Sequence, residues 1–176
     1  MTSEEVVQKV TLDLGDKIER GEVSLGDAVL FLGPGSLIEV ATHLKNDPEL
    51  AFDYLSNISG VDYLDEDREP RFEAVYEFHS MDHNHSIRLR VGLEEENPTV
   101  PTVTGLWQSA VYPERELYDM FGFTITGLDN SKRLIMPEGW EGYPLRKDYP
   151  LTTEDIAFSH NRDYKRELVK SKPPTR

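Results

Sequence analysis

The chain has 176 residues, a formal charge of −14 at pH 7 and no cysteine. Its length suits one domain with tails, and the lack of cysteine excludes disulfides, thiolate-bound metal sites and cysteine-ligated iron–sulfur clusters. The acidity argues against nucleic-acid or anionic-membrane partners. No stretch approaches the ~20 apolar residues of a membrane-spanning helix, and the acidic start has no targeting pattern. We therefore expect a soluble, cytoplasmic protein.

Apolar residues repeat with helical and strand periods in turn along the chain. Ser3 is expected to cap the first helix, which should end at Gly15. The expected elements are a helix between these two residues, a strand over 28–32, a helix over 37–44, strands over 72–78 and 87–91, and a hairpin connection over 79–86. This mixture predicts an α+β, two-layer domain with a mixed or antiparallel sheet and helices on one side.

The sequence divides into a domain over residues 1–136 and an extended, loop-rich C-terminal arm over 137–176. The arm repeats Tyr-Pro-Leu at 143–145 and 149–151, and its last fifteen residues carry a net charge of +4. Proline fixes both tripeptides as extended chain. A segment so poor in apolar periodicity does not offset its own conformational entropy. We expect a partner to order this arm.

A short helix is predicted over 113–121, because Pro113 suits the first turn and Gly122 the position after the last. Glu114 falls on the apolar side of this helix, where a charge is costly unless it is paired. The cations expected to pair with it are Arg133, Arg146 and Lys147. The polar side of the helix carries Arg115, Glu116 and Asp119. These charges predict a network that fixes a loop-rich surface.

Three weaker sequence patterns suggest metal or nucleotide binding. His79, His83 and His85 lie near Asp82 in the expected hairpin, and imidazoles beside a carboxylate can bind a metal. Polar residues in a turn need no such explanation, so this stays an alternative. A Gly-x-Gly turn at 33–35 lacks the third glycine of a dinucleotide fingerprint, and the acidic run from residue 65 lacks the glycine and final glutamate of a calcium loop.

Two long segments resemble a known family. Residues 106–122 read LWQSAVYPERELYDMFG, and residues 133–150 read RLIMPEGWEGYPLRKDYP. Both resemble the signatures of the 30 kDa subunit of respiratory complex I, the NADH:quinone oxidoreductase. The residues that the resemblance assigns to a structural network and docking surface are Trp107, Glu114, Arg115, Glu116, Asp119, Gly122, Arg133, Pro137, Trp140, Gly142, Pro144, Leu145, Arg146, Lys147, Asp148 and Tyr149.

The resemblance implies a scaffold subunit of an enzyme complex that carries electrons from NADH to quinone and translocates protons. Such a chain has no catalytic residues, metal or cofactor of its own, and FMN and iron–sulfur clusters belong to partner subunits. Its partners are chiefly the neighbouring D-type subunit, which forms the quinone site, and adjacent iron–sulfur subunits. The resemblance also implies a peripheral place on the cytoplasmic side of the energy-transducing membrane, without a span.

Three positions depart from the family pattern. Leu128 replaces a usual histidine, Lys132 a usual arginine, and Tyr143 a frequent histidine. These changes leave the electron donor open. The alternatives are the equivalent subunit of a membrane-bound hydrogenase or of a dehydrogenase using ferredoxin or F420H2, and an independent domain that binds metal through the histidine hairpin.

Overall fold

The computed structural model describes residues 1–66, 68–128 and 132–150, and the backbone of Thr153–Asp155 and Leu168–Lys170. Most of the basic end therefore lies outside the described residues. In chain order the elements are α1 (Ser3–Leu14), β1 (Arg20–Ser24), β2 (Asp27–Leu32), the 3-10 turn η1 (Pro34–Ser36), α2 (Leu37–Asn46), β3 (Tyr54–Asp62), β4 (Phe72–Ser80), β5 (His85–Leu93), β6 (Thr99–Pro101), the 3-10 turn η2 (Gln108–Ala110), α3 (Val111–Phe121), β7 (Thr124–Thr126), β8 (Thr153–Asp155) and β9 (Leu168–Lys170).

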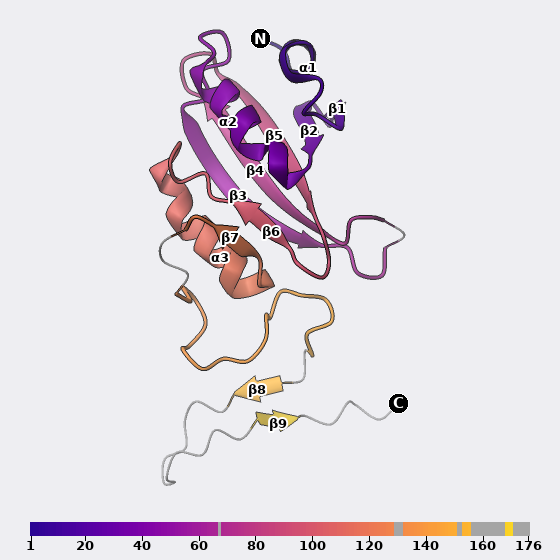
Figure 1. Cartoon of the computed structure of the whole chain (residues 1–176), viewed down its shortest axis with the longest axis vertical. Helices are drawn as coiled ribbons and strands as arrows, with labels where there is room; N and C mark the ends of the chain where they lie inside the picture. Colours follow the sequence, from indigo (N-terminus) through magenta and orange to yellow (C-terminus); the bar gives the residue numbers. More distant parts are fainter. Residues whose placement is uncertain (67, 129–131, 151–152, 156–167, 171–176) are drawn as a thin grey trace.

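The main sheet has five strands in the order β1-β2-β5-β4-β3 (Figure 1). Only β2 and β5 run parallel, and the other neighbours are antiparallel. Cross-strand pairing puts Leu30, Leu89, Tyr76 and Ile58 on one face, where all four are buried. This fold confirms the predicted α+β class and mixed sheet.

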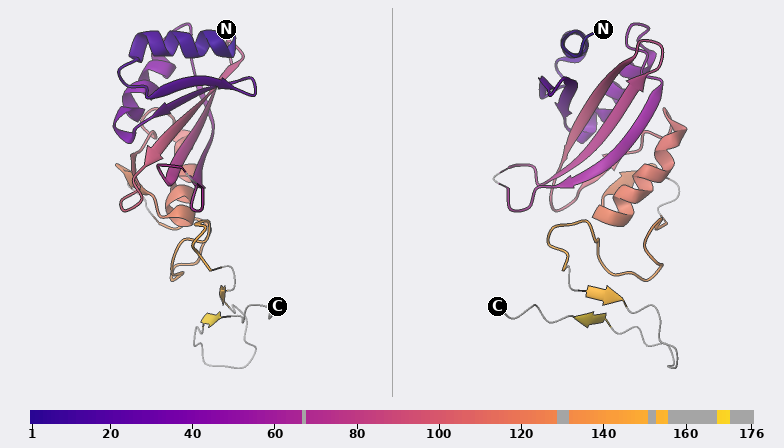
Figure 2. Two further views of the ribbon diagram at one scale, coloured as in Figure 1. Left: turned by 90° about the vertical axis from the view of Figure 1, so that its right-hand side faces the viewer. Right: turned by 180° about the vertical axis from the view of Figure 1, so that it is seen from behind.

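The buried face of the sheet forms the core against the helices (Figure 2). Val6 and Val10 of α1 and Leu37, Val40 and Leu44 of α2 are fully buried in it. At the other end of the sheet α3 lies beside β3, and its last residues enter the same core. Burying each large side chain contributes roughly 1.5–3 kcal/mol. The apolar residues that were predicted to share one face of each helix are therefore the residues that are buried in the core.

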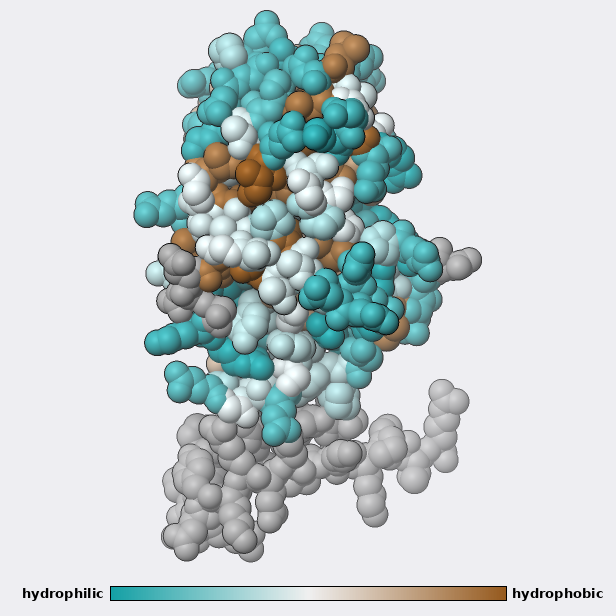
Figure 3. All heavy atoms as spheres, viewed as in Figure 1, coloured by the Kyte–Doolittle hydropathy of each residue, from teal (hydrophilic) through white to brown (hydrophobic). Residues whose placement is uncertain are grey.

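The opposite face of the sheet is polar. Arg88 lies between Glu77, at 2.9 Å, and Asp27, at 3.3 Å, while Arg90 and Arg68 both pair with the buried Glu73. The exposed pairs of Arg88 add little stability, but all of these charges leave the face hydrophilic. Figure 3 shows that the side viewed in Figure 1 is also hydrophilic near the α1 end, with apolar patches toward its middle.

Local details differ from the prediction. Thr2, not Ser3, caps α1: its hydroxyl accepts from the Glu5 backbone amide, and the Glu5 carboxylate accepts from the Thr2 amide. Ser3 instead donates to the carbonyl of Gly26, at 2.5 Å. The final helix begins at Val111, ahead of Pro113. Within the part of the chain that is described, no helix has the length and apolarity needed to cross a membrane.

Candidate docking surface around helix α3

Helix α3 ends at a glycine that the structure requires. Gly122 has φ +72°, in the left-handed region, and its N–H bonds the carbonyls of Leu117 and Tyr118. A Cβ at this position would overlap the ring of Tyr143. Gly122 therefore stops the helix and lets the returning chain pack against the helix end.

Asp119 is the anchor of the surface. Its fully buried carboxylate accepts the backbone N–H groups of Leu134, Ile135 and Met136 at 2.7–3.0 Å and pairs with Arg133 at 2.9 Å. Burial alone would raise the pKa of Asp119, but these hydrogen bonds outweigh it and hold the pKa below its usual value. One carboxylate thus fixes the whole 133–136 loop on α3.

Arg115 and Glu116, on the same side of the helix, have different roles. Arg115 donates to the carbonyls of Lys132 and Arg133, each at 3.1 Å, so it holds the start of the same loop. Glu116 is exposed. Of the three polar residues predicted on this side, two bind the loop and one faces solvent.

Residues 143–147 lie across the end of α3, and we call this segment the strap. The N–H of Leu145 bonds the carbonyl of Met120 at 3.1 Å, and the Nε of Arg146 bonds the carbonyl of Phe121 at 2.5 Å. The Arg146 guanidinium also stacks on the rings of Tyr143, at 4.8 Å, and Phe72, at 5.0 Å. Arg146 is therefore a cap for the last carbonyls of the helix, which satisfies groups that the helix leaves unpaired.

Asp62, at the end of β3, ties the strap to the sheet. Its buried carboxylate binds Arg71 at 2.9 and 3.0 Å and accepts the N–H of Lys147 at 2.9 Å. Burial would raise the pKa of Asp62, but the Arg71 bonds and backbone amides lower it to about 2. Arg71 also pairs with Asp148 at 3.0 Å, and Lys147 reaches the Glu66 carboxylate at 3.3 Å.

The remaining aromatic residues of the segment pack locally. Trp140 stacks with Tyr149, with 6.5 Å between ring centroids, and a Cβ on Gly142 would approach the Tyr149 ring at 2.8 Å. The carbonyl of Pro137 accepts the N–H of Trp140 at 3.1 Å, and Pro144 is half-buried. Residues 140–149 thus form a compact loop. The proposed division of the chain at residue 136 remains a prediction.

The expected cation partner of Glu114 was wrong. Glu114 is fully buried, and its carboxylate accepts the hydroxyl of Thr102 at 2.5 Å and the N–H of Val103 at 2.7 Å. Among the described residues it makes no ion pair, since Arg133 and Arg146 bind the opposite side and the end of α3. Helical position correctly indicated burial. The partner comes from the 102–103 loop, which no helical wheel can show.

Burial raises the pKa of Glu114. Burial, and to a lesser extent the charge of Glu114, raises the pKa of the nearby Tyr76, whose hydroxyl has no hydrogen-bond partner in the described chain. Because the folded pKa of Glu114 exceeds the unfolded one, stability falls as pH rises from the usual glutamate range through the raised value.

We expect Glu114→Ala to lower the free energy of unfolding by about 2–4 kcal/mol, because it orphans the Thr102 and Val103 donors and leaves a cavity. Glu114→Gln keeps an acceptor and removes the fall of stability with rising pH. Glu94→Ala, in an exposed loop, is the control and should change stability by less than ~0.5 kcal/mol. Urea unfolding at several pH values measures all three; equal effects of the two alanine variants would contradict the assignment.

Apolar side chains stand exposed around this charge network. Tyr112 is 63% exposed, Ile135 58%, Leu145 51% and Leu134 37%. They come from α3 and from the two segments that Asp119 and Met120 hold against it. Exposed apolar residues on segments that are held in place in this way are typical of a protein–protein interface. Sequence analysis predicts the charged residues and Leu145 as parts of this surface, but it does not identify Tyr112, Leu134 or Ile135.

Trp107 belongs to the core rather than to the surface. It is 4% exposed, its ring centroid lies 4.6 Å from that of Phe78, and its Nε1 donates to the carbonyl of Asp53 at 3.2 Å. Its role is therefore structural, in holding η2 and the start of α3 on the sheet.

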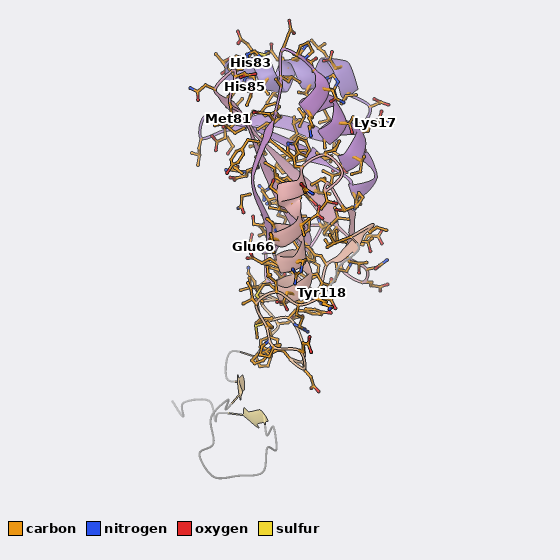
Figure 4. All side chains as sticks on the ribbon, turned by 90° about the vertical axis from the view of Figure 1, so that its left-hand side faces the viewer. Lys17, Glu66, Met81, His83, His85 and Tyr118 are labelled. Atoms are coloured by element: carbon orange, nitrogen blue, oxygen red, sulfur yellow. The ribbon has the colours of Figure 1, made fainter. Side chains whose placement is uncertain are left out.

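The histidine hairpin lies apart from this surface. Met81, His83 and His85 gather at one end of the molecule, far from Tyr118 of α3 (Figure 4). The Nε2 atoms of His83 and His85 bond the carbonyls of Pro48 and Leu50, at 2.9 and 2.7 Å, and His79 bonds Ser86 at 3.0 Å. These bonds tie the hairpin to the loop after α2, which gives the histidines a structural role.

The fold and the α3 surface together define a small α+β protein in which exposed apolar side chains surround a fixed charge network. Residues 31–155 match the family described as respiratory-chain NADH dehydrogenase, 30 Kd subunit. The chain belongs to this family of complex I subunits.

Curated relatives extend the match. The C-type subunit of NADH-quinone oxidoreductase from Roseiflexus sp. (strain RS-1) is 47% identical over 158 residues, 90% of each chain. The corresponding subunit from Salinispora arenicola (strain CNS-205) is 43% identical over 144 residues, 82% of this chain and 58% of that one. These relatives are subunits of an enzyme complex, so the chain is a complex I-type subunit.

Solved structures show the same fold. The trypsin-resistant fragment (1–134) of Nqo5 superimposes with a TM-score of 0.64 at 33% identity, covering 74% of this chain and 99% of that fragment. A chain of the archaeal membrane-bound sulfane sulfur reductase has the same TM-score at 18% identity over 94% of this chain and 98% of that one. At that identity the second likeness concerns the fold alone.

Proposed function

We propose that this chain is a scaffold subunit of the peripheral arm of a proton-translocating NADH:quinone oxidoreductase, docked on the quinone-site subunit through the α3 surface. It carries no redox centre and no catalytic residue of its own; FMN and iron–sulfur clusters belong to its partners. The complex sits on the cytoplasmic side of an energy-transducing membrane, and this subunit is peripheral.

The observation that carries the proposal is the rigid, exposed apolar rim formed by Tyr112, Leu134, Ile135 and Leu145. Asp119, Arg146 and Asp62 fix the segments that present this rim. An interface whose parts are ordered before docking loses less conformational entropy on binding. Rigid positioning also matters for the chemistry of a neighbouring site, because a displacement of ~1 Å can cost about a hundredfold in rate.

Ile135→Asp tests the docking surface. Placing a charge in an apolar interface should reduce the amount of this subunit in the purified complex by at least about tenfold, while the free subunit keeps its unfolding midpoint because the side chain is exposed. Ile38→Asp on α2, where the side chain is 37% exposed, is the matched control and should assemble normally. Normal assembly of Ile135→Asp would contradict docking through this surface.

The electron donor can be identified from the proteins that copurify with this chain. A complex purified through a tag on this chain should contain flavin- and NADH-binding subunits. A hydrogenase module or a ferredoxin- or F420H2-oxidising subunit in their place would identify the related class of complex.

A further inference from the structure

The hairpin between β1 and β2 ends in an unusual turn. Leu25 and Gly26 form its two central residues, with φ of +52° and +95°, between the paired Ser24 and Asp27. These angles are those of a type I′ turn, which favours Asn-Gly, and a leucine with positive φ is strained. The side chain of Leu25 is also completely exposed. The exposed side chain buries no surface within this chain that would offset the backbone strain, which suggests a role in contact with another protein.

Leu25 is the tip of a small apolar knob. Val23, two residues earlier on β1, is 41% exposed, and Met1 is 43% exposed. The bond from the hydroxyl of Ser3 to the carbonyl of Gly26 holds the start of α1 beside the turn. The hairpin stands out from the body next to the N-terminus, at the edge of the sheet (Figure 2). The knob therefore projects from the edge of the sheet that is formed by β1, the strand furthest from β3, beside which α3 lies.

The surroundings of the knob are acidic. Glu4 follows Ser3 and is exposed, Glu22 lies on β1, and Asp27 closes the turn. Arg20 and Arg88 offset two of these charges, at 3.4 Å from Glu22 and 3.3 Å from Asp27. A surface that fits this knob has an apolar pocket for one branched side chain and a rim of lysine or arginine.

We infer that the β1–β2 hairpin is a second docking point, whose tip Leu25 inserts into an apolar, basic-rimmed pocket on another subunit of the complex. This inference rests on the proposed function, because the pocket belongs to a partner in the assembly. Two anchors at opposite edges of the sheet fix the orientation of the subunit as well as its position.

Leu25→Asn distinguishes two explanations of the strained leucine: that it docks on a partner, or that it has no role and the turn merely tolerates it. Asparagine suits the first central position of a type I′ turn, so the unfolding midpoint of the free subunit should rise by about 2–4 °C. The same change removes the apolar anchor, so incorporation in competition with the wild-type chain should fall by about tenfold. A residue that merely tolerates strain would give the first effect without the second.

Leu12→Gln provides the control, because Leu12 on α1 is 86% exposed without backbone strain; it should assemble like wild type. A photo-cross-linking residue at Val23 in the assembled complex should capture a neighbouring subunit at a segment rich in apolar residues and lysine or arginine. Normal incorporation of Leu25→Asn, or no cross-link to another subunit, would overturn the inference. Failure of the wild-type chain to join any complex would instead overturn the proposed function.

Discussion

Asp119→Ala should unfold the α3 surface and abolish assembly. The substitution removes the acceptor for three backbone N–H groups and leaves the Arg133 guanidinium without its carboxylate. Breaking a buried pair by removing one partner costs ~3–5 kcal/mol, and the freed 133–136 loop can no longer hold Ile135 in place. Urea unfolding of the free subunit and the yield of assembled complex measure the two effects.

Glu116→Ala is the control on the same helix, because its side chain is exposed; it should change stability by less than ~0.5 kcal/mol. The pH dependence gives a second check. The folded pKa of Asp119 is lowered, so its contribution is present above the usual aspartate pKa and is lost as pH falls through the folded value. The difference between wild type and Asp119→Ala should therefore shrink in acid. A difference that is small at neutral pH would contradict the anchoring role.

Gly122→Ala should be the second most damaging change. A Cβ at φ +72° is strained by ~1–2 kcal/mol, and it overlaps the Tyr143 ring, which adds ~1–3 kcal/mol of overpacking. We expect a total loss of about 2–5 kcal/mol and displacement of the strap that carries Leu145. Thermal unfolding measures the loss, and limited proteolysis between residues 137 and 150 reports the displacement.

Gly105→Ala is the matched control, because a Cβ there meets no atom within 4 Å and its φ is not positive. It should leave stability within ~0.5 kcal/mol of wild type and leave the cleavage pattern unchanged. Equal effects of the two glycine variants would show that Gly122 is not required by its backbone or by Tyr143.

Sequence analysis predicts a helix or strand well where neighbouring residues alone determine it. Gly122 marks the end of α3 because glycine suits a left-handed C-terminus, and Pro113 lies in the first turn, two residues after the start at Val111. Strand β3 was missed for an equally local reason. Ser56, Asn57 and Ser59 make it polar, and an irregularity between Leu55 and Asn57 breaks the alternation that identifies a strand.

The candidate site was predictable in its residues but not in its pairings. The helical wheel placed Glu114 in the interior, yet its partner Thr102 comes from a loop whose path depends on the tertiary fold. Asp62 and Lys147 are 85 positions apart, so no periodicity links them. The apolar rim was missed because Leu134 and Ile135 look like core residues in sequence. The N–H groups of both residues bond to the buried Asp119 carboxylate, and their side chains stay exposed.

This subunit should join a complex I-type assembly through the rim on α3. The most direct measurement is a structure of the intact complex, purified through a tag on this chain. Ile135 and Leu145 should be buried against the quinone-site subunit, with the Asp119 loop as it is in the free chain. Exposure of both side chains to solvent in the assembled complex, or purification of the chain without partners, would contradict it.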